Sequence, residues 1–165
     1  MSGLSVTEKL RTLAVQDATL QSFFGVDSAT TVMRWFDVQI QPKALQTGLV
    51  IQTQQISESP RPYSHTSALT FTAPLVQFTV RGWPGKVAGV QVVANAPHQV
   101  RQARAAVIAW LGRVCFSASN QFDSPATTPP NYPNFVLNSR ETIDPQLDPP
   151  AWTAQFDARI FNLDN

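Results

Sequence analysis

The sequence predicts an α+β fold: a mostly antiparallel β-sheet of about five strands with two α-helices packed on it, in one domain over residues 1–165. Two segments repeat apolar residues at helical spacing, and several others are rich in β-branched and aromatic residues or alternate polar with apolar positions. With 165 residues, 43% of them hydrophobic, the chain fits one domain of ordinary size. No break in composition indicates a second domain.

The N-terminal region predicts one helix followed by a short helical turn. Ser5 and Glu8 have the spacing of a capping box, and apolar residues follow at helical intervals, so a helix is expected from about residue 5 to residue 15. Asp17 can cap a second, shorter turn. Gly25 would end that turn in the left-handed conformation.

Three extended segments are expected next, over residues 32–40, 49–57 and 68–83. In the third segment, the apolar alternation shifts by one residue at Pro74-Leu75. Proline cannot donate to a strand ladder, and a one-residue shift is what a β-bulge supplies. We therefore expect a bulge or a bend at this point.

The best helix signal in the chain begins at Asn95 or Ala96, because proline at position 97 suits a first helical turn. Its apolar stripe consists of Val100, Ala103, Val107, Trp110, Leu111 and Val114. A stretch with four prolines and no periodicity, residues 117–134, predicts a long loop of the kind that is functional or mobile. Residues 135–142 and 152–163 predict the last two strands.

The charge content is low and favours an assembly subunit. Lys and Arg number 12, Asp and Glu number 11, and together they make up 14% of the chain against a usual value of about 25%. Ser, Thr, Asn and Gln occupy 49 positions, so the surface is expected to be largely uncharged and polar. Such a surface gives little electrostatic self-repulsion between copies.

The charges are also segregated along the chain. Residues 59–122 carry six basic residues and no acid, whereas residues 123–165 carry six acids against two arginines. Two interpretations stay open: the charges interleave in the folded chain, or opposite faces meet between copies or touch nucleic acid. Arg101 and Arg104 project from the helix opposite its apolar stripe. They are either a solvated face or contacts that meet acids of the C-terminal third across a subunit boundary.

No motif predicts catalysis, a cofactor or a metal site. Residues 82–87 have glycines and a lysine but lack the hydroxyl residue and the directly following helix of a P-loop. His65 and His98 lie far apart and belong to no metal-binding pattern. There is no Gly-x-Ser-x-Gly elbow for a nucleophilic serine. We therefore expect a protein that is not an enzyme, without catalytic, cofactor-binding or metal-binding residues.

Three further features favour structural interpretations. Glu141, Asp144 and Asp148 lie among prolines and indicate a solvated turn rather than an acid–base pair. The single cysteine, Cys115, cannot form an internal disulfide and is expected to be a small buried hydrophobic residue. The first 20 residues contain no unbroken apolar region and no run reaches about 18 apolar residues, so a soluble protein made in the cytoplasm is expected.

Four segments in order carry a family resemblance: GLVIQTQQIS, APLVQFTVRG, HQVRQARAAVIAWL and WTAQFDARIF. Preceded by a short N-terminal helix, this succession resembles the tail-terminator, or tail-completion, proteins of long-tailed bacteriophages over most of residues 5–163. The resemblance implies that residues 75–82 form the central strand and that the helix over residues 97–114 packs across the sheet. The loop at residues 117–134 and an insert at residues 83–94 depart from the family pattern.

The resemblance also implies a function. Such subunits form a ring, usually of six, that caps the finished tail tube, stops its polymerisation and joins it to the connector proteins of the head. DNA passes only through the lumen, no membrane is involved, and the protein belongs to the virion. Within this picture, residues 117–134 are expected to be a contact arm with Phe122 and Tyr132 as anchors. Alternatives are a head-side connector or closure protein of the phage neck, or a small-ligand-binding domain or hydrolase-like enzyme.

Overall fold

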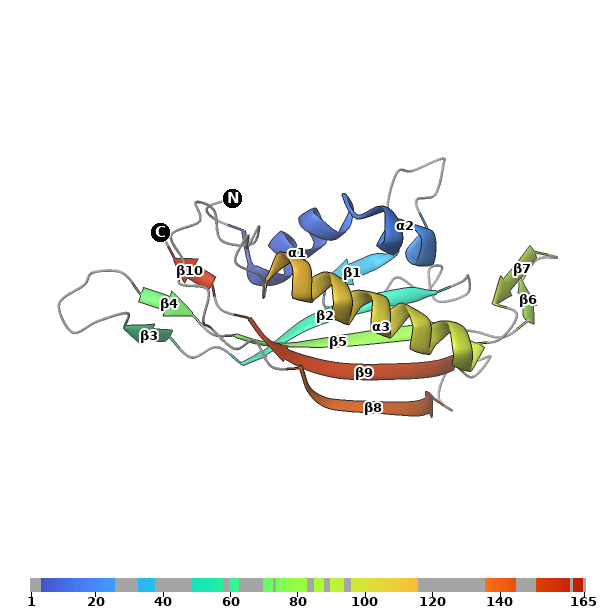
Figure 1. Cartoon of the computed structure of the whole chain (residues 1–165). Coiled ribbons are helices and arrows are strands. Elements are labelled where there is room, and N and C mark those ends of the chain that lie inside the picture. Colours follow the sequence, from blue (N-terminus) through green and yellow to red (C-terminus); the bar gives the residue numbers. More distant parts are fainter. Residues whose placement is uncertain are drawn as a thin grey trace.

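The computed structural model describes residues 4–25, 33–37, 49–57, 60–62, 70–72, 74–82, 85–87, 90–93, 96–115, 136–144, 151–160 and 162–164. In this part of the chain a five-stranded sheet carries three helices on one face, and two smaller sheets extend beyond its ends (Figure 1). The predicted α+β class is confirmed. It includes one more helix than expected, because the turn predicted after Asp17 is a helix of seven residues.

The first two helices begin and end where local sequence signals place them. In α1 (Val6–Ala14), the Ser5 side chain accepts from the Glu8 N–H while the Glu8 carboxylate accepts from the Ser5 N–H, which completes the predicted capping box. In α2 (Ala18–Phe24), the Asp17 carboxylate accepts from the Leu20 N–H. Gly25 ends α2 as expected, with a positive φ of +64° that favours glycine, but its ψ of 148° is not that of the expected left-handed helical conformation.

The central sheet has the strand order β1-β2-β5-β9-β8. Its strands are β1 (Trp35–Asp37), β2 (Val50–Ser57), β5 (Leu75–Gly82), β9 (Ala151–Arg159) and β8 (Val136–Asp144). Only the β1–β2 pair is parallel, and the other three pairs are antiparallel. The expected central position of residues 75–82 is therefore confirmed. Of the strand predicted at 32–40, only residues 33–37 are among those described.

The third helix, α3 (Ala96–Val114), packs diagonally over β5 and β9 (Figure 1). Every residue of its predicted apolar stripe is buried, as is Cys115, which follows the helix. The helix α1 covers β1 and β2, and α2 packs against α3. All three helices thus lie on one face of the sheet. No described element covers the opposite face.

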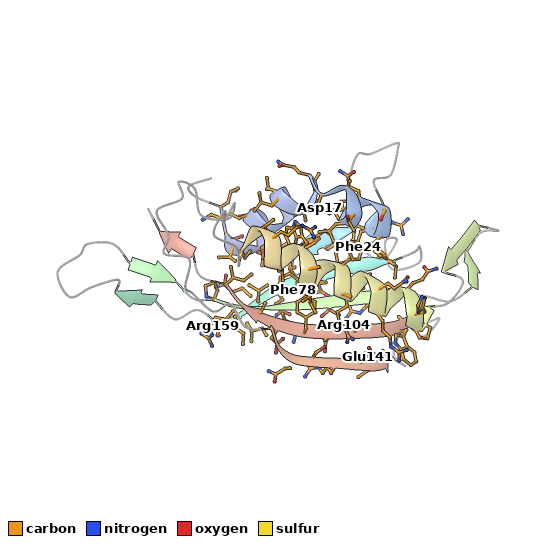
Figure 2. The ribbon with its side chains drawn as sticks, viewed as in Figure 1. Asp17, Phe24, Phe78, Arg104, Glu141 and Arg159 are labelled. Atoms are coloured by element: carbon orange, nitrogen blue, oxygen red, sulfur yellow. The ribbon has the colours of Figure 1, made fainter. Side chains whose placement is uncertain are left out.

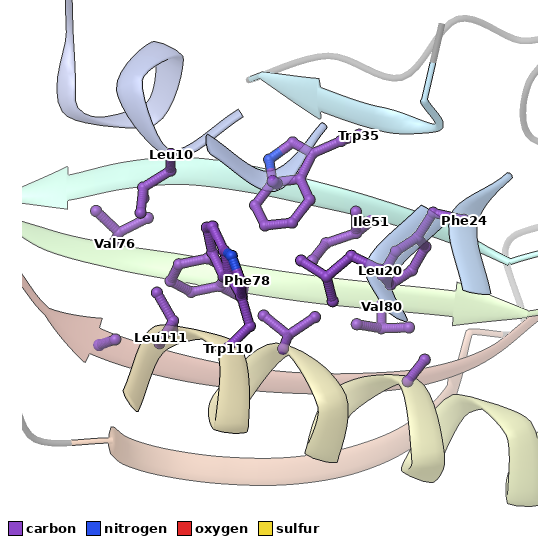
Figure 3. Close-up of a cluster of buried hydrophobic side chains, with 14 of the residues drawn as sticks. Leu10, Leu20, Phe24, Trp35, Ile51, Val76, Phe78, Val80, Trp110 and Leu111 are labelled. Atoms are coloured by element: carbon purple, nitrogen blue, oxygen red, sulfur yellow. The ribbon is translucent and has the colours of Figure 1, made fainter. Parts of the chain in front are cut away.

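Aromatic rings fill the layer between the helices and the sheet (Figure 3). The Trp35 indole makes edge-to-face contacts with Phe24, Phe78 and Trp110, with ring centroids 6.4, 6.2 and 5.5 Å away. Its Nε1–H donates to the Thr53 hydroxyl at 3.2 Å, so the buried polar atom of Trp35 is satisfied. Phe78 also stacks on a phenylalanine of β9, with centroids 4.8 Å apart. These rings join α2, α3 and three strands into one core.

A second small sheet, in the order β10-β4-β3, continues the central sheet outward. It consists of β10 (Asn162–Asp164), β4 (Thr70–Thr72) and β3 (Pro60–Pro62). From the pair Leu75–Arg159 to the pair Thr72–Asn162, each chain advances by the same number of residues, so β5–β9 and β4–β10 share one register. The β2–β5 pair continues into β3–β4 in the same way. We call this three-stranded extension the arm.

The predicted single strand over residues 68–83 is therefore divided between β4, in the arm, and β5, in the central sheet. The strand predicted over residues 152–163 is divided in the same way, between β9 and β10. A register shift does occur beside Leu75, but it lies on the neighbouring strand, between Gln55 and Ser57. Ile56 is the extra residue there. The bulge therefore lies on β2, beside the position where Pro74 of the next strand has no N–H to donate.

The third sheet is a hairpin of β6 (Gly85–Val87) and β7 (Val90–Val93), which lies within the insert at residues 83–94. It leaves the end of β5 that is opposite the arm (Figure 1). In the described part of the chain, its two strands pair only with each other. The central sheet thus has a β-extension at each end.

Candidate interaction surfaces

Arg101 and Arg104 both bind one acid, Glu141. Figure 2 shows Arg104 and Glu141 on the helix-covered side of the sheet. The Arg101 Nε and the Arg104 Nη2 lie 2.9 Å from the two different carboxylate oxygens of Glu141. The two arginines are one helical turn apart on α3, and β8 places Glu141 beneath them. We call this cluster the α3–β8 clamp.

The expectation that these arginines meet acids of the C-terminal third across a subunit boundary stays a prediction, and within one chain both arginines already bind such an acid. Their acid does come from the C-terminal third, but it belongs to the same chain. Folding therefore brings basic residues of the segment 59–122 next to an acid of the segment 123–165. This agrees with the interpretation that the segregated charges interleave in the folded chain. A third pair, Arg113 with Asp17 at 2.8 Å, joins the end of α3 to the start of α2.

The sheet face opposite the helices is covered with amide and hydroxyl side chains. Strand alternation places Thr79, Gln155 and Arg140 on this face, since Phe78 and Phe156 point into the core. The Gln155 amide donates to the Thr79 hydroxyl at 3.1 Å and accepts from the Arg140 Nε at 2.7 Å. A chain of hydrogen bonds therefore crosses three strands. We call this surface the polar face.

Two more hydrogen-bonded groups extend the polar face. At one end, the Arg81 Nη1 donates to the Gln52 side-chain oxygen at 2.9 Å. At the other end, the two oxygens of the buried Asp157 carboxylate accept from the amides of Gln77 at 3.4 Å and Asn138 at 3.1 Å. Asn138 has a φ of +53° at the register shift of β8, and this conformation suits asparagine. The face is polar, with little net charge, and its side chains are held by one another.

One pocket of about 450 Å³ lies between the end of α2 and the start of α3. It is lined by Ser22, Phe23, Phe24, Gly25, Arg34, Leu49, Gln99 and Gln102. Its volume is in the range of small-molecule sites, and its lining combines aromatic rings with amide groups. Sequence reasoning did not find it, because its residues come from four separate segments.

The capping interactions at the starts of α1 and α2 lower the pKa of two carboxylates, Glu8 and Asp17. Partial burial acts to raise the pKa of Asp17, but the Leu20 N–H and the Arg113 guanidinium outweigh it and hold the pKa below its ordinary value. Hydrogen bonds from the Ser5 backbone and hydroxyl lower the pKa of Glu8. Both carboxylates stay charged near neutral pH, where they favour the N-terminal ends of their helices.

Of the two histidines and the loop aromatics considered in the sequence, the structure describes only His98. His98 is exposed in the first turn of α3, whereas His65 lies outside the described residues. Phe122, Tyr132 and the whole loop at 117–134 also lie outside them. Within the described ranges, no three His, Cys, Asp or Glu residues gather as metal ligands, and no helix is long and apolar enough to cross a membrane.

No protein-family model matches the chain, and no curated protein matches its sequence.

Proposed function

We propose that the chain is a structural subunit of the neck of a long-tailed bacteriophage. In this proposal it forms a ring on the end of the tail tube, with six copies by analogy with the family it resembles. The ring ends tube polymerisation and joins the tail to the connector proteins of the head. The observation that carries the proposal is the pair of β-extensions, the arm and the β6–β7 hairpin, which leave opposite ends of the central sheet (Figure 1).

Extensions at opposite ends suit head-to-tail contacts between copies. A head-to-tail interface joins two different patches, and it closes into a ring when its rotation divides the circle. A two-stranded hairpin is at best marginally stable alone in water. The β6–β7 hairpin therefore gains stability if it docks on another surface, and a neighbouring copy supplies one at the concentration reached in a virion.

The character of the sheet supports a role in assembly as well. The helices cover the apolar side of the central sheet. On the polar face, side chains form hydrogen bonds with one another. The low fraction of charged residues leaves little repulsion between copies. The polar face and the low charge content are both consistent with contacts between neighbouring copies through strands and polar groups.

The test is the mass of the protein at high concentration, alone and with purified tail tubes, by native mass spectrometry and electron microscopy. Six copies of 18.1 kDa give a ring of about 109 kDa. We expect this discrete species, seated on tube ends and preventing further growth of tubes. A strict monomer that does not bind tubes would remove the proposal. Binding to head connectors but not to tubes would support the head-side closure protein instead.

The pocket between α2 and α3 supports a second candidate, a small-ligand-binding domain. Its 450 Å³ would hold a ligand with an apolar body against Phe23 and Leu49 and polar groups at Gln99 and Gln102. A thermal-shift screen of small metabolites tests it, because a ligand that binds only the folded chain raises the midpoint of unfolding. A stoichiometric hit that Gln102→Ala abolishes would favour this candidate.

A further inference from the structure

The edges of the β-sheets differ in how well they are protected against pairing. The arm edge β3 carries proline at both of its ends, Pro60 and Pro62, and proline removes the N–H groups that a further strand would need. The opposite arm edge, β10, has only three residues. Among the described edges, β1 is equally short. Of the four edges of the central sheet and the arm, three are thus short, and one of these is also blocked by proline.

The fourth edge, β8, has nine residues and contains neither proline nor lysine. Its register shift protects only the first part, between Leu137 and Arg140. From Arg140 to Asp144 the strand pairs regularly with β9 on one side, and no described strand pairs with its other side. Among the described residues this five-residue stretch is an open edge, and such an edge is a template for another strand.

The β6–β7 hairpin has the complementary composition. Val87, Val90, Val92 and Val93 give it a high strand propensity. Its strands are three and four residues long, short enough to pair along the five regular residues of β8. Lys86 is the one charge of the hairpin, whereas residues 136–150 carry three acids and one arginine. The formal charges of the two segments are therefore opposite.

We propose that the β6–β7 hairpin of one copy adds to the β8 edge of the next copy, so that the central sheet of each subunit is extended by its neighbour. This inference rests on the proposed ring and specifies its interface. The main-chain hydrogen bonds of the added strand provide the affinity, and the alternating side chains provide the register. The donor and the acceptor are different patches, as head-to-tail closure requires.

Cross-linking between two differently labelled chains tests the pairing. One variant carries Gln91→Cys in β7 and the other carries Thr142→Cys in β8, where Thr142 is exposed. The two variants are mixed at assembly concentration and treated with a short bis-maleimide. The control replaces Thr142→Cys with Gln54→Cys, an exposed site on β2. The native Cys115 is buried, so the wild-type chain measures the background.

We expect a cross-linked dimer of the two variants, at least about tenfold more abundant than with the Gln54→Cys control, since a docked strand places positions 91 and 142 side by side. A ring by light scattering without this preference would overturn the hairpin–edge pairing and leave the proposed function standing. A protein that stays monomeric with and without tail tubes would overturn both. Replacement of residues 85–93 by a short Gly-Ser linker should abolish the ring while leaving the unfolding midpoint of the subunit unchanged.

Discussion

The backbone N–H of Ile160 donates to the carbonyl oxygen of Pro74 at 3.0 Å. This hydrogen bond lies where β5 and β9 leave the central sheet and where β4 and β10 begin. Because the register is the same on both sides, the bond continues a ladder rather than starting a new one. The Ile160 side chain is fully buried at the same point and anchors the base of the arm to the core.

Truncation of this anchor should destabilise the subunit. We expect Ile160→Ala to lower the free energy of unfolding by about 2–5 kcal/mol, the usual cost of removing a buried isoleucine side chain. Ile56→Ala is the matched control, because Ile56 lies at the same bend but is 48% exposed. It should change the free energy of unfolding by less than about 0.5 kcal/mol. Urea unfolding monitored by tryptophan fluorescence measures both, and equal losses would contradict the assignment of the anchor.

Two glycines should respond to alanine with opposite signs. Gly25 has a φ of +64° and no atom within 4 Å of an added Cβ, so Gly25→Ala meets only backbone strain. We expect it to destabilise the protein by about 1 kcal/mol. Gly112 lies inside α3 with similar open space, and Gly112→Ala should stabilise by up to about 1 kcal/mol through helix propensity. Thermal unfolding of the two variants provides the comparison, and a shift of both midpoints in one direction would refute it.

The α3–β8 clamp should make a modest, salt-dependent contribution. The Arg104 side chain is 21% exposed and that of Arg101 is 54% exposed, so Arg104→Ala should cost more stability than Arg101→Ala. Each loss is expected to be about 1 kcal/mol or less, because partly exposed ion pairs are screened by water and salt. Urea titrations at low and high salt check this. In a Glu141→Gln background, the two arginine variants should lose most of their effect, and undiminished effects would place the partners elsewhere.

Asp17 should make stability depend on pH in the acid range. The folded pKa is below the ordinary value of 3.8, so the native state binds fewer protons than the unfolded state near that pH. The stabilisation is therefore fully present above the unfolded pKa and is lost as the pH falls through the folded pKa. Asp17→Asn keeps an oxygen for the Leu20 N–H but removes the charge. Its unfolding free energy should fall less steeply between about pH 5 and pH 2 than that of the wild type; parallel curves would exclude Asp17 as a source.

Local signals in the sequence predict the helices well. The Ser5 and Glu8 capping box, the Asp17 cap and Pro97 in the first turn of α3 each act within a few residues, and the structure confirms all three helix starts. The burial of the α3 stripe follows from its spacing. Propensity and periodicity are sufficient where the stabilising contacts lie within one or two helical turns.

Contacts between distant segments could not be predicted in this way. Glu141 lies 40 residues from Arg101, and only the pairing of β8 beside β9 brings it under α3. Alternation in residues 68–83 and 152–163 predicted extended chain, but not the point where each strand passes from the central sheet into the arm. Beside that point, the register shift at Ile56 belongs to a third strand, which the alternation of the other two does not report. The order of the strands in the sheet is determined by loop closure and core packing. Neither produces a pattern within a short stretch of sequence.

The shared register of the arm and the central sheet has a mechanical consequence. Ladder hydrogen bonds lie perpendicular to their strands, so tension along the strands loads many bonds in parallel, whereas tension across them opens one bond at a time. The arm strands β3, β4 and β10 follow or precede β2, β5 and β9, the three middle strands of the central sheet, along the sequence. A pull on the arm along its length is therefore resisted in shear by the β5–β9 ladder, whose register the described β4–β10 pairs share.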